Sequence, residues 1–89
     1  MKKALLITAA LAFTATAAMA GPSCDAPKEK WIPEAKFQQD LKDQGYKVKN
    51  FKVTKGNCYE IYGWNKDGKK VEIYFNPASA EIVKQEIDD

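Results

Sequence analysis

Residues 57–77 constrain the fold most strongly, because two stretches of alternating residues flank a turn within the sequence NCYEIYGWNKDGKKVEIYFNP. The two stretches are residues 58–64 and 70–76. Between them, residues 65–68 read Asn-Lys-Asp-Gly, and Gly68 is free to take the positive φ that a tight hairpin turn requires. The segment is therefore predicted to be a β-hairpin.

Alternation along the two strands divides the hairpin into two faces. One face is expected to lie under a helix as the core, and it carries Tyr59, Ile61, Val71, Ile73 and Phe75. The other face carries Tyr62, Trp64 and Tyr74, which are the candidate partner-binding residues because Trp and Tyr are enriched at interface hot spots. Two alternatives remain open for these residues, namely cover by the N-terminal residues 21–30 and isolated exposure.

A helix is predicted over residues 33–44, where Pro33 suits the first turn. Phe37 and Leu41 are four residues apart and share one face of this helix. Gly45 follows as a C-terminal cap. The narrow apolar stripe indicates that the helix needs a sheet to pack on.

Residues 46–54 are predicted to form a first strand, although its apolar residues change parity along the way. A bulge near Lys49 and Asn50 would return them to a common face. Alternatively, Tyr46 lies outside the strand. After the hairpin, residues 82–87 fit both a helical stripe and a strand. The expected class is α+β, with one short helix on one face of a three- to four-stranded antiparallel sheet.

The first twenty residues are predicted to be a cleaved signal peptide. Lys2 and Lys3 precede an apolar run, and residues 18–20 read Ala-Met-Ala, a pattern that signal peptidase accepts. An uncleaved anchor and lipidation at Cys24 are the alternatives. The expected organisation is a signal peptide (1–20), an extended arm (21–30) and one domain (31–89) in the periplasm or outside the cell, without membrane insertion after cleavage.

The charge balance argues against nucleic acid as a partner. The chain has 14 Lys and Arg residues against 12 Asp and Glu residues, and removal of Lys2 and Lys3 with the signal peptide leaves 12 of each. Nucleic-acid binding requires a basic surface. The lysines at positions 47, 49, 52 and 55 are expected to form a solvated strand face, with contact to an acidic partner as the alternative.

The two cysteines, Cys24 and Cys58, are predicted to form a structural disulfide in an oxidising compartment. Two thiolates without histidine fall short of the four ligands of a zinc site. A redox-active pair usually has the Cys-x-x-Cys spacing, which is absent here. Because Cys58 has the parity of Tyr62, the bond would tether the arm against that face or its edge.

No catalytic, cofactor or metal site is expected, and no cofactor is implied. The chain has no histidine, which removes the usual general base, and it has no Gly-rich phosphate loop. Glu60 and Glu72 could lie near one another across the hairpin, but paired carboxylates need a pocket to act as acid and base. We expect both to be ordinary surface charges paired with lysines such as Lys70. The chain is therefore not expected to be an enzyme.

The order of these motifs resembles the PepSY family over about residues 31–83. The resemblance lies in Trp31 before a short helix, in Gly45-Tyr46, and in the two hairpin strands that lead into Asn76-Pro77. The family commonly continues Asp-Pro-x-Thr-Gly-Glu, whereas this chain has Ala80 in place of the glycine. A residue with a side chain resists positive φ, so the tight turn into a last strand is in question.

The resemblance implies a domain that binds or restrains another protein, and it offers no catalytic residues. The leading hypothesis is a secreted or periplasmic, non-enzymatic module that binds or modulates an unidentified envelope protein, with a protease or other hydrolase as a candidate. The alternative is an accessory protein in envelope redox or metal handling, supported only by the cysteine pair. Inhibition of a lytic enzyme or protease is a third hypothesis.

Overall fold

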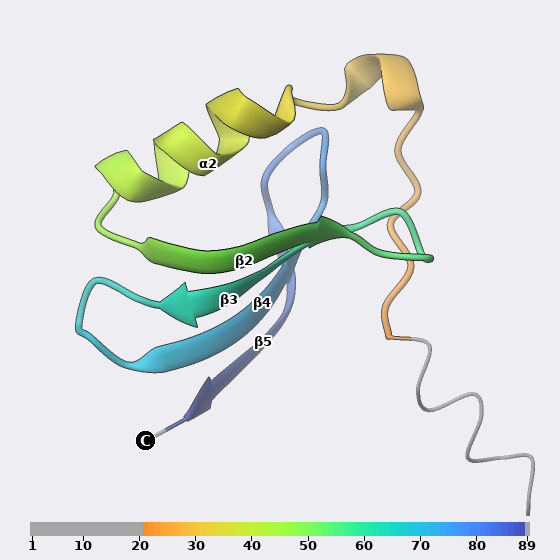
Figure 1. Cartoon of the computed structure of the whole chain (residues 1–89). Coiled ribbons are helices and arrows are strands. Elements are labelled where there is room, and N and C mark those ends of the chain that lie inside the picture. Colours follow the sequence, from red (N-terminus) through yellow and green to blue (C-terminus); the bar gives the residue numbers. More distant parts are fainter. Residues whose placement is uncertain (1–20, 89) are drawn as a thin grey trace, which may run out of the picture.

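An α-helix lies across one face of a four-stranded antiparallel sheet in this computed structural model, which describes residues 21–88 (Figure 1). The sheet order follows the chain. The elements are η1 (Lys28–Lys30), α2 (Glu34–Asp43), β2 (Lys47–Val53), β3 (Tyr59–Trp64), β4 (Lys70–Phe75) and β5 (Ile82–Asp88). The predicted α+β class is confirmed, with four strands. The signal peptide predicted over residues 1–20 lies outside the described residues.

Helix α2 forms where the sequence predicts it, and it is one residue shorter at each end. Pro33 precedes the first helical residue in an extended conformation, and its carbonyl accepts the backbone N–H of Phe37 at 2.9 Å. Phe37 and Leu41 are both buried against the sheet. Gly45 ends the helix at a φ of 101°, a conformation that glycine adopts readily. The helix therefore depends on the sheet to cover its apolar stripe.

The predicted bulge is present in β2, between Val48 and Asn50. It brings Val48 and Phe51 onto the core face together, and Tyr46 packs on the same core from just before the strand. Gly63 lies opposite Val48, and a Cβ at Gly63 would collide with the carbonyl oxygen of Lys47. The bulge is therefore possible because position 63 has no side chain.

The core has the composition that alternation predicts. Its buried residues are Phe37, Leu41, Tyr59, Ile61, Val71, Ile73 and Phe75. The ring of Phe37 lies 4.9 Å from that of Tyr59 and 5.0 Å from that of Phe75, centroid to centroid. Such tilted and edge-on ring pairs stabilise a core beyond the area they bury.

The last element is a strand, and the turn that leads into it forms without the family's glycine. Ala80 has a φ of 65°, in the left-handed region that a side chain disfavours. The Asn76 side chain stabilises this turn, because its Oδ1 accepts the backbone N–H groups of Ala78 and Ser79. The backbone N–H of Ala80 donates to the Asn76 carbonyl at 2.8 Å. Side-chain capping thus holds Ala80 in an unfavourable conformation.

The N-terminal arm makes more contacts than its composition suggests. Residues 28–30 form the short 3₁₀ helix η1, where the sequence indicates only an extended segment. The Trp31 indole N–H donates to the Ala26 carbonyl at 3.0 Å, and its ring meets Tyr59 edge-on. The Tyr59 hydroxyl donates to the Ile32 carbonyl at 2.6 Å. These contacts hold the segment that precedes α2 against the core.

Candidate protein-binding face

The sheet has a second face, opposite α2, which we call the outer face. Strand register places its side chains in three rows across the sheet: Lys52, Glu60, Tyr74 and Lys84; then Asn50, Tyr62, Glu72 and Glu86; then Lys47, Trp64, Lys70 and Asp88. The outer face thus combines aromatic rings, carboxylates and lysines, whereas the face under α2 is apolar.

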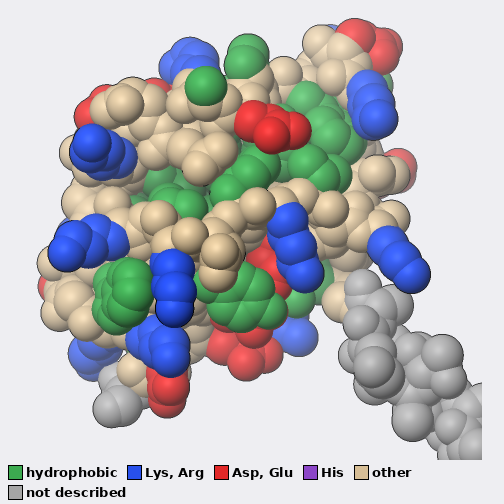
Figure 2. Space-filling model, viewed as in Figure 1, with side chains coloured by type: hydrophobic (Ala, Val, Ile, Leu, Met, Phe, Trp, Pro, Cys, Tyr) green, Lys and Arg blue, Asp and Glu red, His purple; other side chains and the backbone are tan. Residues whose placement is uncertain are grey.

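The three predicted partner-binding residues lie together on the outer face. Tyr62 is 40% exposed, and Trp64 and Tyr74 are half-buried. Figure 2 shows hydrophobic patches among lysines over the strands below the helix. A hollow of about 270 Å³ lies beside Tyr62, where Glu72 and Glu86 also line it. Alternation along β3 and β4 was sufficient to predict this grouping.

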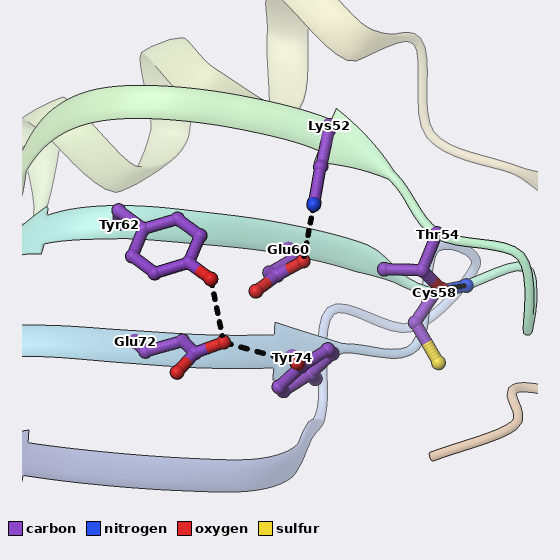
Figure 3. A network of polar contacts seen from close by, with 7 residues as sticks. All are labelled: Lys52, Thr54, Cys58, Glu60, Tyr62, Glu72 and Tyr74. Carbon is purple, nitrogen blue, oxygen red and sulfur yellow. Dashed lines mark hydrogen bonds and ion pairs between the residues drawn. The ribbon is translucent and has the colours of Figure 1, made fainter. Parts of the chain in front are cut away.

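Glu72 is the centre of a hydrogen-bond network on this face (Figure 3). The hydroxyls of Tyr62 and Tyr74 donate to the same carboxylate oxygen of Glu72, at 2.9 and 3.0 Å. The hydrogen bond to Glu72 is the main cause that raises the pKa of Tyr62 to about 12. Burial, followed by the hydrogen bond to Glu72, raises the pKa of Tyr74 above its ordinary value. Both phenols stay protonated at neutral pH and orient the two rings.

Glu60 is buried, which contradicts the prediction of an ordinary surface charge. It is only 2% exposed, and its ion pair is with Lys52, at 3.6 Å, and not with Lys70. Tyr74 lies directly opposite Glu60 on β4, and Tyr62 lies two residues further along β3. These large side chains surround the carboxyl group. Alternation alone does not reveal this burial, because it cannot show that side chains close over the face without a helix.

The ionisation of Glu60 depends on its neighbour Glu72, and that of Glu72 depends on Glu60. Glu60 Oε2 is buried without a hydrogen-bond partner. Burial is the main cause that raises the pKa of Glu60, followed by the hydrogen bond that its protonated form donates to Glu72. The pKa of Glu72 is lowered, mainly by the hydrogen bond that it accepts from protonated Glu60 and further by the two tyrosine hydroxyls, although burial opposes the shift. A proton on Glu60 supplies the donor that Oε2 otherwise lacks, so protonation completes the network.

The predicted disulfide between Cys24 and Cys58 is present, with a sequence separation of 34 and a Cα–Cα distance of 5.0 Å. The backbone N–H of Cys24 donates to the Gly56 carbonyl at 2.8 Å. A Cβ at Gly56 would collide with the carbonyl oxygen of Pro22, so the arm depends on this glycine for its close approach. The bond therefore fixes the arm at the β2–β3 turn.

The arm covers one end of the outer face and leaves the other open. Gly21 lies beside the Tyr74 ring, so that a Cβ at this glycine would be 3.6 Å from a ring carbon. Tyr62 stays exposed despite the arm. The two interpretations of the aromatic residues each hold for a part of the face, with cover at Tyr74 and exposure at Tyr62.

The family comparison agrees with this architecture. A family model described as peptidase propeptide and YPEB domain matches residues 4–86. Such domains are generally non-catalytic, propeptide-like or inhibitor-like modules that occur in secreted or periplasmic proteins. Searches of curated proteins and of solved structures gave no match. Among residues 21–88, no helix combines the length and the apolar character needed to cross a membrane.

Proposed function

This chain belongs to the PepSY family of peptidase propeptide and YPEB domains, and on that premise we propose that it binds and modulates another protein of the cell envelope through its outer face. The residues that carry this proposal are Tyr62, Trp64 and Tyr74. A protease or another hydrolase is the candidate partner, because the family includes peptidase propeptides.

The observation that carries the proposal is the exposed aromatic end of the outer face. Tyr62 remains 40% exposed on a sheet whose other face carries the buried core under α2. The N-terminal arm is tethered close by, at Cys58, and yet it does not extend over this residue. Aromatic side chains at the centre of an interface supply much of its binding energy.

The hydrogen bonds to Glu72 favour binding by fixing the rings in advance. Tyr62 and Tyr74 both donate to this carboxylate, so their side chains have little freedom to lose when a partner docks. Each rotamer-rich side chain that is immobilised on binding costs roughly 0.5–1.5 kcal/mol. A surface that is already ordered avoids part of that cost.

We further propose that the protein is non-enzymatic and acts in the periplasm or outside the cell. Glu60 and Glu72 are the carboxylates closest to an acid–base pair, but Glu60 is only 2% exposed, which leaves its carboxyl group little access to a substrate. The family occurs in secreted and periplasmic proteins, which supports the proposed location.

The alternative of a redox or metal accessory receives less support. Cys24 and Cys58 are 7% and 0% exposed, and thiol–disulfide exchange needs access to a sulfur atom. Within residues 21–88, no cluster of three or more His, Cys, Asp or Glu side chains is placed to hold a metal ion. The buried bond favours a structural role for the pair.

Crosslinking in the envelope extract of the producing cells tests the proposal. The wild type is compared with Trp64→Ala and with the matched control Gln39→Ala, an exposed position on α2. We expect a defined protein to be crosslinked by the wild type and the control and to be lost with Trp64→Ala. The captured protein is then purified, and its hydrolytic activity is measured with and without this chain.

Two results would contradict the proposal. One is that the wild type captures nothing beyond what Trp64→Ala captures. The other is that the Gln39→Ala control loses the same protein, which would locate the contact on the helix.

A further inference from the structure

Strand β5 is an open edge of the sheet. It is the last strand in the sheet order, and all seven of its residues are exposed. Its apolar side chains Ile82, Val83 and Ile87 are 46%, 44% and 47% exposed. Helix α2 lies over the β2 side of the sheet and does not extend to β5 (Figure 1). An edge of this kind is a template for pairing with another strand.

The opposite edge of the sheet is protected by charge. Strand β2 carries exposed lysines at positions 47, 49 and 52 and has no acidic residue. Lysines on an edge strand oppose pairing with a further strand. Strand β5 instead carries both signs of charge, with Lys84, Glu86 and Asp88, so it does not present charge of one sign to a second strand.

Residues 83–87 of β5 are complementary to themselves when the strand is reversed. In an antiparallel pair centred on Gln85, Lys84 lies opposite Glu86 of the second copy, and this contact occurs twice by symmetry. Val83 lies opposite Ile87 of the second copy, also twice. Cross-strand pairs of opposite charge and of apolar side chains each stabilise a sheet.

The pairing of β5 with β4 shows on which face of the sheet the side chains of β5 lie. Lys84 and Glu86 pair with Tyr74 and Glu72 of β4, so both lie on the outer face. Ile87 pairs with Val71, so it lies on the helix side. Residues directly opposite each other in an antiparallel pair must point to the same face, and the Lys84–Glu86 pairs satisfy this condition. Val83 lies at a bulge in β5 and has no register partner on β4. Beyond the bulge Ile82 pairs with Phe75 on the helix side, so the matched pairing does not extend to Ile82 and Asp88.

Other registers are less favourable. A shift of two positions in one direction places Lys84 opposite Lys84, and a shift in the other direction places Glu86 opposite Glu86. Like charges directly opposite one another are destabilising. Odd shifts set outer-face residues against helix-side residues and break the alternation of faces. Only the register centred on Gln85 gives opposite charges without a like-charge pair.

We propose that β5 pairs antiparallel with β5 of a second copy of this chain, centred on Gln85. The pairing joins two sheets into one of eight strands, with both helices on the same face. Lys84, which lies 3.7 Å from Glu86 of its own chain, gains Glu86 of the second copy as an additional partner. A contact of one strand is small, so a monomer–dimer equilibrium that depends on concentration is expected.

Charge reversal on β5 tests the pairing by sedimentation of the full chain, purified as the producing cell processes it. Lys84→Glu and Glu86→Lys should each raise the dimer dissociation constant about tenfold or more, because each creates two like-charge pairs. A mixture of the two variants should restore the dimer, because every pair is then opposite in charge. Lys49→Glu, the same change on the β2 edge, should have no effect, and neither should Trp64→Ala on the outer face.

A cysteine at the centre of symmetry tests the register. In an antiparallel pair, Gln85 and its copy would have Cα atoms about 4.5–5.5 Å apart, within the range that a disulfide spans. Gln85→Cys should therefore form a covalent dimer on mild oxidation, and the control Lys49→Cys should not.

Four results would overturn the proposal. They are a wild type that stays monomeric at every concentration, a dimer that Lys49→Glu weakens as much as Lys84→Glu does, a dimer in which Gln85→Cys does not crosslink, and a different protein that occupies β5 in place of the second copy. The proposed function survives any of these results, because it depends on Trp64 and its neighbours.

Discussion

The two faces of the sheet are built from the same strands and differ in how their side chains are satisfied. Under α2, seven buried residues pack against one another, with Phe37 at the centre of three ring contacts. On the outer face, Glu72 accepts two tyrosine hydroxyls, and Glu60 is buried beside them. The core face therefore contributes stability through area removed from water, and the outer face holds an ordered surface through directed polar contacts.

Truncation of the core face should have the largest effect on stability. Phe37→Ala is expected to lower the free energy of unfolding by about 3–5 kcal/mol, because it removes a fully buried ring and leaves a cavity. Urea denaturation measures the change. A loss below about 1 kcal/mol would mean that the helix is not required to close the core.

Removal of the disulfide should have the next largest effect, and it acts at the end of the outer face. The paired change Cys24→Ser and Cys58→Ser is expected to cost about 3–4 kcal/mol, because it releases a loop constraint in the unfolded chain. Hydrogen exchange should also rise in the arm and not in α2. Equal exchange gains in both regions would show that the bond supports the core as a whole.

Glu60→Gln should raise stability at neutral pH and flatten its dependence on pH. The pKa of Glu60 is raised above its ordinary value of 4.5 in the folded protein. The stabilisation that protonated Glu60 contributes is therefore complete below pH 4.5 and is lost as the pH rises through the folded pKa. Glu72 has a lowered pKa and acts in the opposite direction, because its contribution is lost as the pH falls below 4.5.

Thermal unfolding from pH 4 to pH 8 measures this difference. The wild type should lose stability above about pH 4.5 relative to Glu60→Gln, since Lys52 is largely exposed and compensates little. Glu29→Gln, at an exposed position on η1, is the control and should follow the wild type. Parallel curves for Glu60→Gln and the wild type would contradict the buried, proton-sharing pair.

A smaller gain is expected from Ala80→Gly, which relieves a left-handed residue outside both faces. Its φ of 65° predicts a stabilisation of about 1 kcal/mol, measured by urea denaturation. Ala78→Gly, in the same turn, is the control and should bring no gain. A loss of stability with Ala80→Gly would show that the Asn76 cap removes the strain.

Alternation predicted much of this fold, and its failures have local physical causes. Alternation predicts that residues such as Ile61 and Ile73 lie on the core face, because a helix covers only one side of the sheet. Glu60 could not be placed by parity, because its burial depends on where the Tyr62 and Tyr74 rings lie. Strand β5 was ambiguous with a helix because all of its residues are exposed and no burial pattern distinguishes its faces.

The sequence predicted which residues form the candidate site, but it did not predict how their side chains are arranged. The sequence assigned Tyr62, Trp64 and Tyr74 to one face, and the structure places them there. The hydrogen bonds to Glu72 and the cover of Tyr74 by Gly21 depend on contacts between distant segments, which a single strand pattern does not encode.

Site-specific photo-crosslinking tests most directly the claim that the core face stabilises the protein while the outer face binds a partner. p-Benzoylphenylalanine replaces Tyr62 in one variant and Gln39 on α2 in the other, and both are exposed to light in the producing cells. We predict one specific adduct with another envelope protein from position 62 and none from position 39, with unfolding free energies that stay close to the wild type. No adduct at position 62, or the same adduct from both positions, would contradict the account.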